Sequence, residues 1–273
     1  MTFRFVPYSL TITVLFFASA TSNAGSIFLT GHDPDFHASQ GGNAGGAQNI
    51  NKAAIGFIMD PAFNSYAAGG ATKFLFVESN IVPPGGHVVG ADGIVASGYV
   101  LGTDFEKHDA STLNAELDLL GTKYAGIVVA SDFGGILTQD ELDILNARKN
   151  TIINFLNKGG GLYAMAESDN GAGLTPNGGR FGYLPFVASE VSLDQSESGF
   201  TVTPFGSSLG LTDNDINGNA SHNVFTAFDG LSVVDFDASG RVMSVAGRGL
   251  VTPEPASMAI LSLGVLAAFR RRR

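Results

Sequence analysis

The sequence of 273 residues contains no cysteine and no tryptophan. The absence of cysteine excludes disulfide bonds, thiolate ligands for a metal ion and a cysteine nucleophile. Glycine, by contrast, is frequent, at 36 residues. These glycines do not recur at every third position, which excludes a collagen-like chain.

Basic residues are also scarce. The chain has 15 lysines and arginines against 25 aspartates and glutamates, so its formal net charge is −10. This charge argues against nucleic acid as a partner, because phosphate groups attract basic surfaces. Hydrophobic residues make up 44% of the chain and charged residues only 15%, a balance that favours a packed core over disorder.

The N-terminus has the features of a secretory signal peptide over residues 1–24. Arg4 supplies a positive charge, residues 10–20 are mostly apolar, and small residues stand at the third and first positions before Gly25. The apolar run is too short for a membrane-spanning helix of about 20 residues. We therefore expect export through the secretion machinery of the inner membrane, with cleavage before Gly25.

The C-terminus, residues 251–273, has three parts. Pro253-Glu254-Pro255 interrupts regular structure, residues 256–269 are apolar, and four arginines complete the chain. This order resembles the PEP-CTERM sorting signal of Gram-negative bacteria. The resemblance implies a hydrophobic transmembrane helix that acts as a transient anchor, cleavage by an exosortase, and release to the cell surface or to an exopolysaccharide matrix.

The body between these two ends, residues 25–250, is more acidic than the whole chain. Without Arg4 and the four terminal arginines, 10 basic residues remain, and without Glu254, 24 acidic residues remain, so the body carries a formal charge of −14. Acidic exported proteins without disulfides are often stabilised by divalent cations such as calcium.

Predicted strands and helices alternate along the body. The predicted strands are residues 26–30, 73–77, 124–130 and 162–166, followed by weaker segments at 200–204, 231–236 and 241–246. The predicted helices are residues 47–63, 89–97, 111–120 and 138–157. The last helix begins with a capping box formed by Thr138 and Glu141, and glycines follow its end.

This alternation predicts an α/β fold, a three-layer sandwich with a mostly parallel sheet and helices on both faces. Strands 124–130 and 162–166 are expected to be adjacent and parallel, with the helix over 138–157 as the connection between them.

The order of the units over residues 26–184 resembles the class I glutamine amidotransferase-like fold, which is a flavodoxin-like sandwich. The similarity rests on Gly31-His32-Asp33 after the first strand, on residues 124–135, and on the helix–glycine–strand unit that ends at 166. In that family this last strand delivers a cysteine nucleophile at a sharp elbow. Here the elbow falls at Glu167 or Ser168, so the resemblance implies a domain without the family's glutaminase chemistry.

Ligands of parallel sheets bind beyond the carboxyl ends of the strands. In this sequence each of those ends is followed by polar residues: His32-Asp33, Glu78-Ser79, Ser131-Asp132 and Glu167-Ser168. We expect His32, Asp33, Asp132 and Glu167 to bind a ligand. His108 precedes a predicted helix and is expected at the surface.

Two segments contain residue types that bind metals. The first, which includes His32 and His37, combines two imidazoles with two carboxylates, as in a zinc-type site, or it is a solvated turn. The second has Asp213, Asp215 and Asn217 at alternating positions, as in a calcium-binding loop. Because Val224 stands where such a loop has its last glutamate, this segment is either a weak calcium site or only a turn.

Two functions fit these patterns. The first is an exported, surface-associated or matrix-associated protein whose amidotransferase-like domain binds a ligand without catalysis. The second is a secreted hydrolase for a surface polymer or a small ester, with Ser168 or Glu167 acting together with His222 or His32. The relative positions of His32, Glu167 and His222 would distinguish the two.

Overall fold

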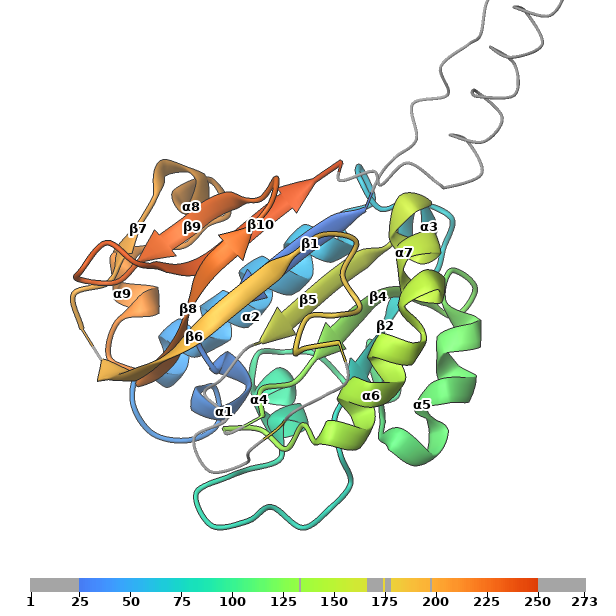
Figure 1. The fold of residues 1–273 in the computed structure, drawn as a ribbon, viewed down its shortest axis with the longest axis horizontal. Coiled ribbons are helices and arrows are strands. Elements are labelled where there is room, and N and C mark those ends of the chain that lie inside the picture. Colours follow the sequence, from blue (N-terminus) through green and yellow to red (C-terminus); the bar gives the residue numbers. More distant parts are fainter. Residues whose placement is uncertain (1–24, 133, 166–173, 175–177, 197, 250–273) are drawn as a thin grey trace, which may run out of the picture.

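The computed structural model describes residues 25–132, 134–165, 174, 178–196 and 198–249 (Figure 1). Both predicted terminal signals, residues 1–24 and 251–273, lie outside the described residues. Over the described residues the chain forms a mixed α/β body around a curled sheet of 10 strands.

One half of the sheet is parallel, as predicted. Its strands, in the order in which they lie side by side, are β3 (Phe105–His108), β2 (Lys73–Val77), β4 (Tyr124–Val129), β5 (Gly161–Met165) and β1 (Ser26–Thr30). The predicted pairing of residues 124–130 with residues 162–166 is confirmed, with Ile127 opposite Leu162 in parallel register. Strands β1, β4 and β5 are buried throughout, which is typical of parallel strands covered on both faces.

The other half of the sheet is antiparallel. It consists of β10 (Val242–Arg248), which pairs with β1, and of β8 (Ser221–Phe228), β6 (Ala188–Ser196), β9 (Ser232–Phe236) and β7 (Thr201–Val202). The prediction of a mostly parallel sheet was therefore wrong. Only a short turn connects β9 to β10, and these two strands pair with each other. Such turns join antiparallel strands, whereas a parallel pair needs a longer crossover.

Helices cover both faces of the parallel half. Figure 1 shows α2 (Ala44–Met59) behind the central strands, and α6 (Gln139–Ala147) and α7 (Lys149–Asn157) in front of them. The shorter helices are α1 (Pro34–His37), α3 (Ser65–Ala68), α4 (Gly90–Ala96), α5 (Ala110–Glu116), α8 (Pro204–Ser208) and α9 (Asp213–Ile216), with a 3-10 turn at Leu117–Leu119.

The helix predicted over 138–157 is divided into α6 and α7 at Arg148. Its backbone there has φ −94° and ψ 14°, outside the α-helical range. The Arg148 side chain bonds to Asn114 of α5 and to Asp118, so it is directed toward the neighbouring helix. The capping box of Thr138 and Glu141 is confirmed.

The two ends of the described body meet. The backbone amide of Gly249 donates to the carbonyl of Gly25 at 3.3 Å, and the amide of Gly25 donates to Leu156 O at the end of α7 at 2.7 Å. Next to this contact, the Arg248 guanidinium lies over the ring of Phe63, 3.6 Å from its centroid. The last strand is thus held beside the first.

Candidate functional site

The carboxyl ends of the parallel strands carry buried polar side chains. Those that directly follow β1, β2 and β4 are at most 4% exposed: His32, Asp33, Glu78, Ser79, Ser131 and Asp132. Three of the predicted ligand-binding residues, His32, Asp33 and Asp132, therefore lie along one edge of the sheet. The fourth, Glu167, lies outside the described residues. Because buried polar groups need hydrogen-bond partners, their partners indicate what each can do.

Asp35 joins the end of β1 to the end of β4. Its carboxylate accepts hydrogen bonds from the backbone amide of Ser131 at 2.9 Å and from the Ser131 hydroxyl at 2.7 Å. The Ser131 hydroxyl in turn accepts from the amide of Gly135 at 2.7 Å. Ser131 is completely buried and bonded on both sides, so it links two loops and is not placed to act as a nucleophile.

Glu78 joins β2, β3 and α4. Its carboxylate accepts from the amides of Gly90 and Ala91 at the start of α4, at 2.5 and 3.2 Å. It also forms an ion pair of 3.1 Å with Lys107 of β3. Burial raises the pKa of Glu78, and the partly opposing effect of Lys107 does not cancel this. Glu78 is therefore a structural carboxylate at this edge.

His32 lies between a serine and an aspartate. Its Nδ1 is 2.5 Å from the Ser221 hydroxyl oxygen, and its Nε2 is 2.7 Å from Oδ2 of Asp235. When Nε2 carries the proton, it donates to Asp235, and Nδ1 accepts from the Ser221 hydroxyl. Serine hydrolases use these three residue types, although there the serine faces Nε2 and the aspartate faces Nδ1.

Burial separates this Ser–His–Asp group from solvent. Ser221 and Asp235 are 0% exposed, and the ring of Phe200 packs edge-on against the imidazole with centroids 5.3 Å apart. Gly31 permits the close approach of β8, because a Cβ atom there would lie 2.0 Å from the carbonyl oxygen of Asn223. The group connects β1, β8 and β9 inside the core, where no substrate reaches the hydroxyl.

The candidate metal residues after β1 are only partly brought together. Nε2 of His37 lies 3.5 Å from Oδ1 of Asp33. Both ring nitrogens of His32, however, are bonded to Ser221 and Asp235, so a metal ion would have to displace one of these partners. A metal at this turn stays a prediction, for which Asp33 and His37 are the adjacent pair.

The candidate calcium segment folds as the short helix α9. Asp215 accepts from the amide and the hydroxyl of Thr212, at 2.8 and 2.7 Å, and so caps this helix. Asp213 accepts from an amide of β7 at 2.7 Å, and the Asn217 side chain bonds to the backbone of Phe200. A calcium ion would compete with these bonds. Calcium binding here stays a prediction.

Arg180 connects the sheet edge to the antiparallel half. Its guanidinium donates to Oδ2 of Asp132 at 2.5 Å and lies 3.4 Å from Oε1 of Glu190 in β6. Glu190 also accepts a hydrogen bond from the side chain of Asn223 in β8. Arg180 and Glu190 were not predicted from the sequence, because neither follows a recognisable parallel strand.

An open pocket of about 770 Å³ lies beside this network. Its described walls are α6 with the start of α7 on one side, and residues 178–182 and 186–190 on the other. This volume is in the usual range for small-molecule sites. The pocket contacts the sheet edge through Arg180, which lines it and holds Asp132.

Of the three predicted catalytic residues, only His222 lies within the described part of the chain. His222 is buried in β8, and its backbone amide donates to the carbonyl of Gly31 at 3.4 Å. The structure thus brings the strand of His222 beside the end of β1. Glu167 and Ser168 lie outside the described residues, so their pairing with His222 or His32 stays a prediction.

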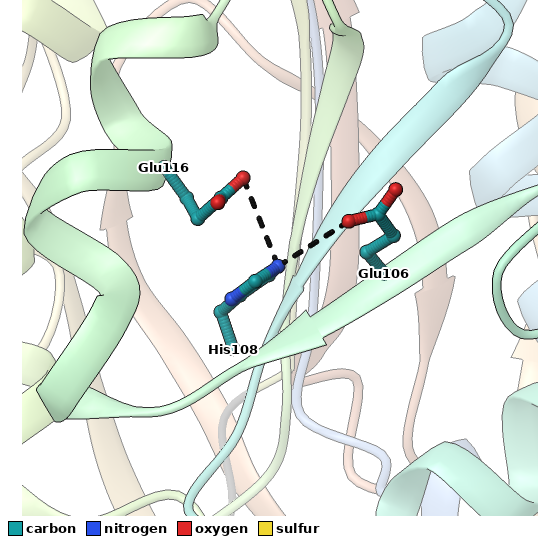
Figure 2. A group of neighbouring side chains, drawn as sticks. All are labelled: Glu106, His108 and Glu116. Carbon is teal, nitrogen blue, oxygen red and sulfur yellow. Dashed lines mark ion pairs between the residues drawn. The ribbon is translucent and has the colours of Figure 1, made fainter.

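A second group of ionisable side chains, Glu106, His108 and Glu116, lies at the β3 edge (Figure 2). Nε2 of His108 is 3.6 Å from Glu106 and 3.7 Å from Glu116. His108 is half-buried and does not simply face solvent, as the sequence had suggested. The spacing of Glu106 and His108 could have predicted this group, because alternate residues of a strand lie on the same face of the sheet.

Two lysines already neutralise this group. Glu106 forms ion pairs with Lys73 at 2.7 Å and with Lys123 at 2.6 Å, and Lys123 also reaches Glu116 at 3.0 Å. Hydrogen bonds from Lys123 and Lys73 lower the pKa of Glu106 to about 2. Burial opposes ionisation of Glu116, but hydrogen bonds from Tyr124 and Lys123 hold its pKa below the usual value. A metal ion here would have to displace the lysines.

Comparison with known proteins identifies one part of the chain. Residues 251–273 match the family model described as the PEP-CTERM protein-sorting motif. This match suggests an exported protein with a C-terminal anchor that an exosortase, a sorting enzyme, recognises and cleaves. No curated protein and no solved structure matches the chain significantly, so these comparisons give the amidotransferase resemblance no support. Within the described ranges, no helix has both the length and the apolar character needed to cross a membrane.

Proposed function

We propose that this protein is exported, processed at its sorting motif, and retained at the cell surface or in the extracellular matrix, where its α/β body binds a ligand without catalysis. The motif at 251–273 supports the first part. The observation that carries the second part is the open pocket beside Arg180, Asp132 and Glu190.

The bonding at the sheet edge favours binding over turnover. Asp35 is bonded to Ser131, Glu78 to two amides and Lys107, and Asp132 to Arg180. These groups hold loops in place, and a general base needs an accessible proton acceptor beside the substrate. Five parallel strands with helices on both faces remain compatible with an amidotransferase-like domain. Without cysteine, such a domain has no thiolate for glutamine hydrolysis.

Co-sedimentation tests this proposal. The protein, purified from the surface of its own cells, is mixed with extracellular matrix isolated from cells that lack it. We expect the protein to sediment with the matrix and to release no ammonia from glutamine. A protein that stays in the supernatant would contradict the binding role, and ammonia release would contradict the absence of catalysis.

A secreted hydrolase, in which Ser168 or Glu167 acts together with His222 or His32, is the second candidate, because the strand of His222 lies beside the end of β1 that carries His32. The buried Ser221–His32–Asp235 group serves as a comparison, because it has the residue types of a serine hydrolase. Hydrolysis of p-nitrophenyl acetate by the full chain tests this second candidate. Loss of activity in Ser221→Ala would assign the reaction to the buried group. Loss in Ser168→Ala would instead support the elbow serine. Equal background hydrolysis by all three proteins would exclude both.

A further inference from the structure

The pocket beside Arg180 is built from two walls that the structure fixes to each other. Asn146 of α6 donates from its side-chain nitrogen to the carbonyl of Gly179 on the opposite wall, at 2.9 Å. On the Gly179 wall, Phe181 is buried and packs against Phe225 of β8, with ring centroids 5.6 Å apart. The pocket is therefore formed before a ligand arrives, which lowers the entropic cost of binding.

The polar groups of this pocket are held in defined directions. The Arg180 guanidinium is oriented by Asp132 from the end of β4 and by Glu190 from β6. Glu190 is itself held by the side chain of Asn223. Groups fixed in this way discriminate between ligands by the positions of hydrogen-bond donors and acceptors.

Among the described residues that line the pocket, the formal charges cancel. Asp143 and Glu190 supply two negative charges, and Lys149 and Arg180 supply two positive charges. The body as a whole carries −14, a field that repels polyanions. A ligand with a strong charge of either sign thus gains little in the pocket, and an anionic polymer is disfavoured by the rest of the surface.

The remaining lining combines planar polar groups with an apolar ring. Asn146 contributes an amide, Glu190 a carboxylate and Arg180 a guanidinium, while Phe186 adds a half-buried ring. Hydroxyl groups both donate and accept hydrogen bonds, so a polyhydroxylated ligand can bond to an amide, to a carboxylate and to a guanidinium alike. The C–H face of a sugar ring has the apolar surface that a phenyl ring packs against.

We infer that this pocket binds a neutral oligosaccharide. The inference rests on the proposed binding role and specifies its ligand class. The pocket has exposed lining residues on both walls, among them Lys149, Val187 and Ser189, so a chain of several sugar units can enter from solvent and extend beyond the walls.

Titration calorimetry on the full chain tests this inference, in a detergent without a sugar headgroup, because a glycoside detergent would compete. The neutral probes are cellohexaose, maltohexaose and mannohexaose, and the acidic probe is an alginate hexamer. We expect at least one neutral probe to bind and the alginate hexamer to bind more weakly or not at all. Failure of all three neutral probes, or preference for alginate, would overturn the inference.

A matched pair of variants locates the site. Ser189 lines the pocket and is exposed, whereas Ser192 is exposed on the same strand, β6, outside the lining. Ser189→Trp should weaken binding of the neutral probe by at least about tenfold, because the indole fills the entrance, and Ser192→Trp by less than about twofold. Near-ultraviolet circular dichroism confirms that both variants are folded. Equal affinities would place the bound sugar elsewhere and overturn the inference.

The matrix co-sedimentation experiment separates this inference from the proposed function. If the protein sediments with matrix and an excess of the neutral probe does not release it, the binding role stands and the assignment of a neutral sugar fails. If the protein does not sediment at all, the binding role itself fails.

Discussion

The carboxylate of Asp35 accepts two hydrogen bonds from Ser131, from its amide at 2.9 Å and from its hydroxyl at 2.7 Å, although 96 residues separate them. Both residues are fully buried, and the contact passes from the end of β1 to the end of β4 across the end of β5 between them. The edge of the sheet that carries the candidate site therefore depends on contacts between distant parts of the chain.

Asp35→Ala is expected to lower the free energy of unfolding by about 2–4 kcal/mol, because it leaves the buried amide and hydroxyl of Ser131 without an acceptor. Urea denaturation measures this. As the control, Asp229→Ala removes an exposed carboxylate in the turn after β8, and should change stability by less than about 0.5 kcal/mol. Similar losses in both variants would mean that the Asp35 contact contributes little.

Two glycine substitutions should have opposite effects. Gly56 lies on the exposed side of α2 with no atom within 4 Å of an added Cβ, so Gly56→Ala should stabilise the protein by about 0.5–1 kcal/mol through helix propensity. At Gly31 an added Cβ would lie 2.0 Å from a backbone oxygen of β8. Gly31→Ala should therefore destabilise by more than about 2 kcal/mol, because overpacking forces the strands apart. Thermal or urea denaturation of the two variants, compared with the wild type, shows whether Gly56→Ala raises the stability and Gly31→Ala lowers it.

The pH dependence of stability should include a contribution from Glu106. Hydrogen bonds from Lys123 and Lys73 lower its pKa in the folded state from 4.5 to about 2. The folded protein therefore favours the ionised form, and this contribution is present above pH 4.5 and is lost as the pH falls toward about 2.

In Glu106→Gln this contribution is absent, so its free energy of unfolding should fall less than that of the wild type between about pH 6 and about pH 3. Urea denaturation at these two pH values measures the change in the free energy of unfolding of each protein. Asp92→Asn, which alters an exposed carboxylate in the first turn of α4, serves as the control and should follow the wild type. A Glu106→Gln curve parallel to that of the wild type would contradict the assignment.

Processing should remove both ends of the chain. Because residues 251–273 match the sorting motif, the form recovered from the surface of the producing cells should lack Arg270 to Arg273. It should also lack residues 1–24 if the predicted signal peptide is cleaved before Gly25. Intact-mass spectrometry of that form shows whether each of the two ends has been removed. A surface form that retains the terminal arginines would argue against cleavage at the motif.

The sequence predicted the elements with a strong apolar pattern. The predicted bounds of β1 and β2 agree with the structure, and those of β4 and β5 agree to within one residue at either end. Strands β3, β6 and β8 were missed. Strand β3 has only four residues, three of them charged or histidine, and β6 alternates polar residues with partly exposed apolar ones. Neither pattern differs clearly from that of a loop.

The candidate site was predicted only in part for a related reason. His32, Asp33 and Asp132 follow recognisable strands, so their shared edge could be inferred from topology. Their partners could not be inferred, because His32 and Asp235 are 203 positions apart in the sequence and no pattern between them predicts their pairing. Arg180 likewise reaches Asp132 over 48 residues through a segment without regular structure.

The pairing of β1 with β10 has a consequence for the order of folding during export. The first and last strands of the body are neighbours in the middle of the sheet, and β10 ends at Arg248, three residues before the sorting motif. If the chain is exported from its N-terminus, as the predicted signal peptide implies, β1 can pair with β5 on one side, but its other edge is covered only when nearly the whole body has followed. Pairing over so long a stretch is slow and leaves a strand edge open to other chains. The exported chain is therefore most exposed to aggregation in the interval before its last strand arrives, and slowing the delivery of that strand should increase the demand for chaperones outside the inner membrane.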